Sequence, residues 1–149
     1  MRISRYTQVA AFLMLALAVD SSRAISQEKP SGRELPRAAE RPGVNADVLA
    51  RTEVPGAPGK VMIVSRTTYQ PGARLRKHYH TSQVTFYILE GAMTVQDEGK
   101  EPVTLKAGDF LLIKPGTVHA HWNASATAPL VFLEHVIVDQ DQRSAVFME

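Results

Sequence analysis

Short hydrophobic runs, separated by breaks rich in glycine and proline, make up the chain from about Asp47 to its last residue. They are rich in Val, Ile, Leu, Phe, Tyr and Thr, which favour β-strands. In order, the runs are KVMIVSRTTY, ARLRKHYH, VTFYILEG, AMTVQDEG, EPVTLKAGD, FLLIKPGTVHAHWN and PLVFLEHVIVD. Strands at such spacing are typical of an antiparallel sandwich or barrel. No stretch after Ala50 sustains the apolar stripe of a helix, so we predict one all-β domain over residues 47–149.

One break between two of these runs predicts a specific hairpin. The stretch VQDEGKEPV places Asp97, Glu98 and Gly99 between two strand-like segments. Acidic residues followed by glycine favour tight turns between antiparallel strands. We therefore expect these three residues at the tip of a hairpin.

The first 24 residues have the layout of an export signal. Two arginines within residues 1–8 precede the apolar run VAAFLMLALAV, and SSRA then offers small residues before a cut after Ala24. This is the three-part pattern of a secretory signal peptide. The apolar run is shorter than the roughly 20 residues that span a bilayer. We predict cleavage after Ala24, a periplasmic or secreted mature protein and no stable membrane anchor; the alternatives are a buried core helix or an uncleaved anchor.

Residues 25–46 are polar, contain three prolines and show no sustained apolar periodicity. Such a composition does not bury enough apolar surface to fold by itself. We interpret this segment as a flexible leader that joins the signal peptide to the domain.

Charge and cysteine content exclude several classes of function. The full chain has a formal net charge of +2, but residues 1–24 hold three arginines and one aspartate, so 14 basic and 14 acidic residues remain without them. A neutral mature chain gives no support for a nucleic-acid partner. The chain has no cysteine. Disulfides, thiolate metal sites and cysteine nucleophiles are therefore excluded.

The candidate chemistry lies in the histidines. His78 and His80 are two residues apart in one predicted strand, and His119 and His121 repeat that spacing in another. Side chains at i and i+2 of a strand point to the same face, so each pair can reach one point in space. Either a metal site or two pairs of surface or hydrogen-bonded histidines is compatible with this spacing.

The glycines and asparagine around these histidines resemble the two motifs of the cupin superfamily. The first motif, Gly, five residues, His-x-His, three or four residues, Glu, six residues, Gly, is matched except at its glutamate. The second, Gly, five residues, Pro-x-Gly, two residues, His, three residues, Asn, is matched except at its proline, a position that holds Lys114. The matching positions are Gly72, His78, His80, Gly91, Gly108, Gly116, His119 and Asn123.

The resemblance spans about residues 57–138 and implies an antiparallel double-stranded β-helix, the jelly-roll or cupin barrel. By carry-over of the motif positions, it implies that His78, His80 and His119 hold one divalent transition-metal ion. It also implies a homodimer. The fold hosts many chemistries, so the resemblance alone does not identify a reaction.

The glutamate of the first motif falls at Val84 in this chain. Three neutral imidazoles leave a divalent ion its full charge, so we expect a site that favours Fe, Zn, Cu or Ni over the harder Mn²⁺ and binds anionic chelating ligands. Three histidines with an open position are a known catalytic arrangement.

Five further residues are candidates for the site. His121 could be a fourth ligand, a donor to a ligand, a general base or a core histidine, and Gln83 could replace the glutamate if a bulge turned it inward. Arg76 shares strand parity with His78 and could bind a carboxylate at the pocket mouth, unless a bend breaks the alternation. Val84 and Phe86 are predicted to form pocket wall.

Two functions remain open from the sequence. The first is a metal-dependent enzyme of dioxygenase, isomerase or lyase type acting on a small oxygen-bearing substrate. The second is a non-catalytic barrel that binds a small ligand or a metal, which the missing glutamate favours. The chain has no nucleophile elbow, no phosphate-binding glycine loop and no HExxH helix.

Overall fold

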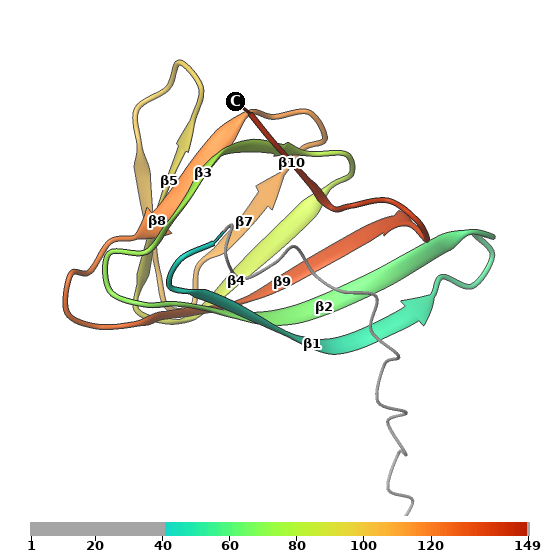
Figure 1. Ribbon diagram of the computed structural model, residues 1–149, viewed down its shortest axis with the longest axis horizontal. Coiled ribbons are helices and arrows are strands. Elements are labelled where there is room, and N and C mark those ends of the chain that lie inside the picture. Colours follow the sequence, from blue (N-terminus) through green and yellow to red (C-terminus); the bar gives the residue numbers. More distant parts are fainter. Residues whose placement is uncertain (1–40, 149) are drawn as a thin grey trace, which may run out of the picture.

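Two five-stranded antiparallel sheets face each other in the computed structural model, which describes residues 41–148 (Figure 1). One sheet has the order β1-β2-β9-β4-β7, with bounds β1 Val44–Glu53, β2 Lys60–Tyr69, β9 Leu130–Asp139, β4 Val84–Glu90 and β7 Phe110–Ile113. The other has the order β10-β3-β8-β5-β6, with bounds β10 Ala145–Phe147, β3 Arg74–His80, β8 His119–Asn123, β5 Ala92–Asp97 and β6 Val103–Lys106. The predicted all-β jelly roll is confirmed.

The strands follow from alternation along the sequence. In β4, Val84, Phe86 and Ile88 are buried while Tyr87 is exposed. In β9, Phe132 and Val136 are buried on the same inner face. Because successive strand residues point to opposite faces, the two inner faces meet to form one apolar core between the sheets.

Gly91 explains why the first motif ends in glycine. It is the only residue between β4, in one sheet, and β5, in the other, and its φ is 77°. A Cβ at this position would lie 2.5 Å from the carbonyl oxygen of Pro129. Only glycine combines this left-handed backbone with so close an approach of the segment that leads into β9.

Asn123 explains the polar end of the second motif. Its Nδ2 lies 2.8 Å from the carbonyl oxygen of Ala128 and within 3.3 Å of those of Tyr69 and Gln70. Its Oδ1 accepts a hydrogen bond from the backbone of Ser125. The side chain is buried, and it supplies hydrogen bonds to backbone carbonyls at the point where the strands end. It thereby connects the end of β8 to the end of β2.

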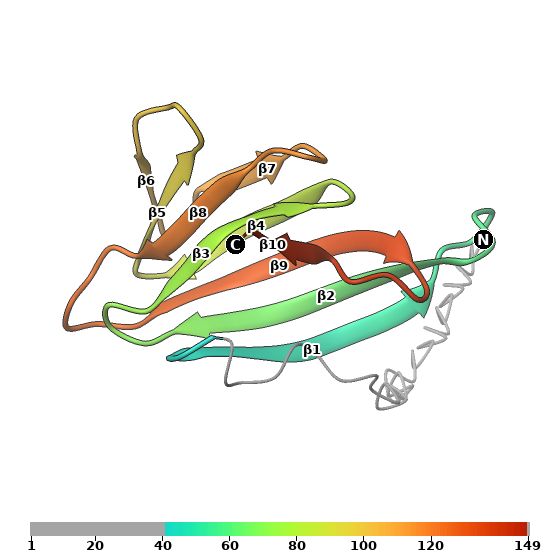
Figure 2. The same ribbon diagram turned by 45° about the horizontal axis from the view of Figure 1, so that its top comes forward.

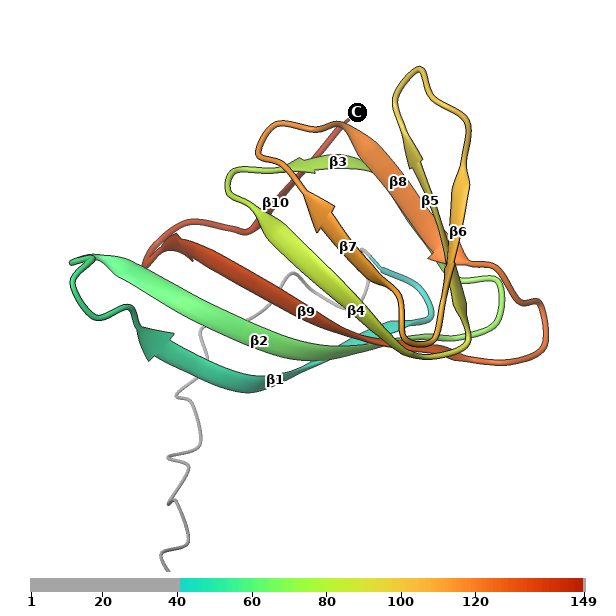
Figure 3. The same ribbon diagram turned by 180° about the vertical axis from the view of Figure 1, so that it is seen from behind.

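The predicted hairpin tip is present, since β5 ends at Asp97 and a turn over residues 98–100 leads toward β6. Figure 3 shows this hairpin of β5 and β6 standing out at the edge of its sheet, next to β8.

Two strands go beyond the predicted runs. β1 begins at Val44, so residues 44–46, assigned above to the leader, belong to the sheet. Their side chains are alternately half-buried and exposed, and their backbone pairs with β2. β10 is only three residues long and pairs with β3 near the end of the chain (Figure 2). The predicted signal peptide and most of the leader lie outside the described residues, within which no helix is long and apolar enough to cross a membrane.

Candidate metal centre

Three histidine side chains converge on one point between the sheets. His78 and His80 come from β3 and His119 from the neighbouring β8, where it is the register partner of His78. One ring nitrogen of each histidine lies within 4.8 Å of those of the other two. All three side chains are buried, with exposed fractions of 0%, 3% and 1%. The structure therefore brings together the three residues that the motifs single out.

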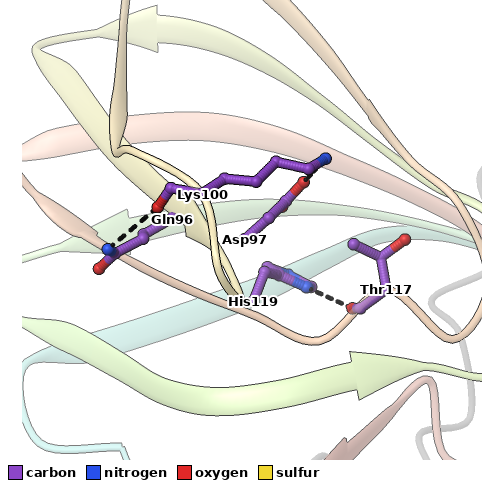
Figure 4. A network of polar contacts seen from close by, with 5 residues as sticks. All are labelled: Gln96, Asp97, Lys100, Thr117 and His119. Atoms are coloured by element: carbon purple, nitrogen blue, oxygen red, sulfur yellow. Dashed lines mark hydrogen bonds and ion pairs between the residues drawn. The ribbon is translucent and has the colours of Figure 1, made fainter.

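Backbone carbonyls fix the orientation of all three rings. Nδ1 of His78 lies 2.8 Å from the carbonyl oxygen of Arg76, that of His80 lies 2.9 Å from Ser144, and that of His119 lies 2.9 Å from Thr117. Because a carbonyl oxygen can only accept, each Nδ1 carries the proton and each Nε2 keeps its lone pair. Figure 4 shows this for His119, beside the Asp97–Lys100 ion pair.

The three Nε2 atoms are buried and have no hydrogen-bond partner. An unsatisfied buried acceptor costs free energy, and three of them at one point are unusual unless something binds there. A ligating histidine normally donates its other N–H to a carbonyl or carboxylate, which is the arrangement found here. The cluster thus has the tautomers and the convergence that a divalent ion requires.

Burial keeps these histidines neutral. It lowers the pKa of His78 to about 3, and the neighbouring His119 adds to the effect. It lowers the pKa of His80 to about 4, against the opposing hydrogen bond to Ser144. The pKa of His119 is also lowered by burial, and the hydrogen bond to Thr117 and the charge of Asp97 partly offset this. Neutral imidazole is the form that binds metal.

A pH-dependent stability follows for the metal-free protein. The unfolded chain takes up protons at His78 and His80 as pH falls below 6.5, whereas the folded chain does not until about pH 3 to 4. Each histidine should therefore cost about 2 kcal/mol of folding stability at pH 5 relative to pH 7.

The raised pKa of Glu134 acts in the opposite sense, because acid relieves the cost of its buried charge. The lowered pKa values of His119 and His121 add to the fall, so the folded protein should be clearly less stable at pH 5 than at pH 7. Urea unfolding of chelator-treated protein at pH 7 and pH 5 measures this difference in stability. The same free energy of unfolding at both pH values would contradict the prediction that the histidines are buried and neutral.

His121 lies beside the cluster but outside it. Its Nδ1 is 3.2 Å from the hydroxyl of Tyr69, and its ring stacks on that of Tyr69 with centroids 5.6 Å apart. Burial sets its pKa well below the ordinary value. Burial also raises the pKa of Tyr69, so the phenol keeps its proton. Of the alternatives open from the sequence, this arrangement is that of a core histidine.

Gln83 is exposed and precedes β4, and no bulge turns it inward. Val84 is fully buried on the inner face, with Val136 and Ile113 as its register partners. Phe86 is also buried and lies 6.5 Å from His80, ring centroid to ring centroid. The position at which the family motif has a carboxylate is therefore occupied by an apolar side chain of the core.

Arg76 does not share the face of the histidines. The pairing of β3 with β8 shifts by one residue between Leu75 and His78, which is a β-bulge. Leu75 and His78 are both buried, and Arg76 and Lys77 between them are both exposed. The prediction that Arg76 shares the face of His78 is therefore wrong, and the alternative, a bend that breaks the alternation, is the one observed. The guanidinium of Arg76 nevertheless lies 5.5 Å from the ring centroid of Phe147, at the edge of the site.

Four residues near the cluster were not found by sequence reasoning. Phe147 of β10 pairs with His78, and their ring centroids are 5.4 Å apart. Tyr69 and Glu134 lie on the inner face of β2 and β9, in strands whose alternation is visible in the sequence. Arg41 lies in a segment with no strand pattern. Only the alternation signal could have located any of them.

Comparisons with known proteins agree with this architecture. A family model described as a cupin domain matches residues 65–136. Quercetin 2,3-dioxygenase of Bacillus subtilis (strain 168) is 41% identical over 64 residues, which are 42% of this chain and 18% of that protein. The uncharacterized protein YdbB of the same organism is 35% identical over 72 residues, 48% of this chain and 58% of that one. The chain thus spans less than two thirds of either relative.

Among solved structures, a cupin-like protein from Thermotoga maritima superposes with a TM-score of 0.57 at 28% identity. The alignment covers 70% of this chain and 75% of that one. Residues 65–136, which the family model matches, contain both histidine-bearing strands, β3 and β8.

Proposed function

We propose, from the premise that this chain belongs to the cupin superfamily, that it is a metal-dependent enzyme acting on a small oxygen-bearing substrate. His78, His80 and His119 would hold one divalent ion, which is Fe, Zn, Cu or Ni rather than Mn. The single observation that carries the proposal is the set of three buried, unpartnered Nε2 atoms that face one another.

A bound ion would supply Lewis acidity or the activation of O₂. The protein's own groups define the rest of the site. Phe86 and Phe132 pack edge to face with centroids 5.1 Å apart and exclude water from the inner wall. Glu134 shares that wall, and burial raises its pKa, so its carboxyl group retains a proton more readily than an exposed one. Glu134 is therefore the candidate proton donor on β9.

A dioxygenase-type reaction is the best-supported choice. A relative named as quercetin 2,3-dioxygenase shares 41% identity over a segment of 64 residues. Isomerase and lyase chemistry on a small acid are the other reaction types that such a site can host. The second candidate function, a non-catalytic binding barrel, is favoured by one observation. A buried valine stands where the family motif has a carboxylate.

Turnover by the metal-loaded protein tests the proposal. Mature protein is loaded separately with Fe, Zn, Cu, Ni and Mn, and oxygen uptake and substrate loss are followed with diketones, catechols, flavonols and uronates. We expect about one ion per chain and metal-dependent turnover of at least one compound. One bound ion without turnover of any compound would favour the metal-binding barrel. No bound ion would overturn the enzyme and the metal-binding barrel, and would leave only a barrel that binds a small ligand.

Export and dimer formation remain predictions. We propose that the mature protein is periplasmic or secreted, on the basis of residues 1–24 alone. A homodimer is supported by exposed apolar side chains on the outer faces of β4 and β7, namely Tyr87, Leu89, Phe110 and Leu112.

A further inference from the structure

Two arginines converge on one aromatic ring at the edge of the histidine cluster. The guanidinium carbon of Arg41 lies 5.8 Å from the ring centroid of Phe147, and that of Arg76 lies 5.5 Å from it. Phe147 is the register partner of His78, so its ring lies on the same face of the sheet as the cluster. A pair of positive charges therefore borders the candidate metal centre on the β10 side.

Arg41 is held in place by the backbone around it. The carbonyl of Arg41 accepts a hydrogen bond from Val44, and the carbonyl of Gly43 accepts one from Gln70 at the end of β2. Gly43 has a φ of 73°, which turns the chain sharply before β1 begins. The segment is thus fixed against the β2–β3 connection, and the side chain of Arg41 is directed into the molecule.

Arg41 forms no ion pair with another of the described residues. Its Nε is buried and has no hydrogen-bond partner, and none of the ion pairs formed by residues 41–148 includes Arg41 or Arg76. A buried guanidinium nitrogen with no partner is costly unless a ligand supplies the acceptor.

The contact of Arg41 with Phe147, whose ring lies beside that of His78, places the guanidinium at the β10 side of the cluster. Its positive charge also reaches the other sheet, because it opposes the rise that burial gives the pKa of Glu134 on β9.

We propose that Arg41, assisted by Arg76, forms an anion-binding subsite that selects substrates carrying a carboxylate away from their metal-chelating oxygens. This inference rests on the proposed function, because the chelating end of the substrate needs the three-histidine centre. The planar guanidinium of Arg41 matches a carboxylate in two parallel hydrogen bonds. Arg76, which is exposed, adds attraction at the mouth. The substrate class is thus a small ring or chain with a chelating group at one end and a carboxylate at the other.

A matched pair of ligands tests the subsite without turnover. Catechol and 3,4-dihydroxybenzoate chelate through the same two oxygens, and only the second carries a carboxylate. Their affinities for the zinc-loaded protein are measured by calorimetry, and zinc content is checked in each sample. We expect the wild type to prefer the carboxylate by roughly 10- to 100-fold, the range of a hydrogen bond to a charged group.

Arg41→Gln should abolish this preference while leaving zinc content and catechol affinity unchanged. Arg41→Lys should keep part of this preference, because the positive charge remains but the planar guanidinium that makes two parallel hydrogen bonds is lost. Arg66→Gln is the control, since it removes an exposed arginine from β2. If Arg41→Gln does not fold, Arg76→Gln, at an exposed position, carries the test with a smaller expected loss.

Each other outcome has a definite meaning. Equal affinities in the zinc-loaded wild type, a preference that survives both Arg41→Gln and Arg76→Gln, or an equal loss in Arg66→Gln overturns the subsite and leaves the proposed function standing. Failure of the wild type to retain zinc, or any other divalent ion tried in its place, overturns both together.

Discussion

Stoichiometric metal retention is expected to disappear when either His80 or His119 is replaced by alanine. Each imidazole supplies one of three convergent lone pairs, and two remaining ligands would leave the ion mostly in water. Loss of an outer partner of a ligand commonly costs 10- to 100-fold in metal affinity, so loss of a ligand itself should cost more than about 100-fold.

The measurement is metal content after dialysis against buffer, together with thermal melting in the presence of the metal. Wild-type protein should gain about 2.7 kcal/mol at a metal concentration 100 times the dissociation constant, and the variants should gain almost nothing. His135→Ala is the matched control, because His135 is on the opposite face of β9 from Glu134. Equal retention by wild type, His80→Ala and His119→Ala would remove the candidate metal centre.

Val84→Glu should make the folding of the protein depend on metal. Val84 is fully buried at the position where the family motif has its glutamate. Without metal, the new carboxylate is a buried and unpaired charge, which costs about 3 to 5 kcal/mol. With metal, it can become the fourth ligand and reduce the charge of the centre from +2 to +1. The added oxygen ligand should also improve binding of Mn²⁺ relative to the wild type.

Melting curves with chelator and with each metal test this expectation. Val136→Glu is the control, since Val136 is buried, faces the same core and is the register partner of Val84 on β9. It should be destabilised as much as Val84→Glu but should not be rescued by metal. If metal rescues both variants equally, or neither, the position of Val84 relative to the centre is not that of a ligand.

The bulge in β3 shows what local pattern cannot supply. Alternation places Arg76 with His78, and the extra residue between Leu75 and His78 breaks that parity. A bulge depends on how β3 pairs with β8, which lies more than 40 residues further along the chain. The sequence of residues 74–80 alone does not predict how β3 pairs with β8.

The sequence by itself determined the strand-rich domain and the hairpin at Asp97 to Gly99, because these depend on periods of two residues and on turn residues within short segments. The three histidines were singled out by the resemblance of the two motifs to those of the cupin family. The glycine and asparagine positions of the two motifs were also found from the sequence. The structure explains two of them, Gly91 and Asn123, by the contacts they make.

Only the tertiary structure decided which groups surround the histidines. Ser144 holds the ring of His80, Phe147 lies beside His78, and Arg41 reaches the site from a segment that precedes the first strand. These contacts join the two ends of the described chain to its centre. Short segments with weak patterns, such as β10 and residues 41–43, become ordered through the partners they meet, and those partners are set by the packing of the two sheets.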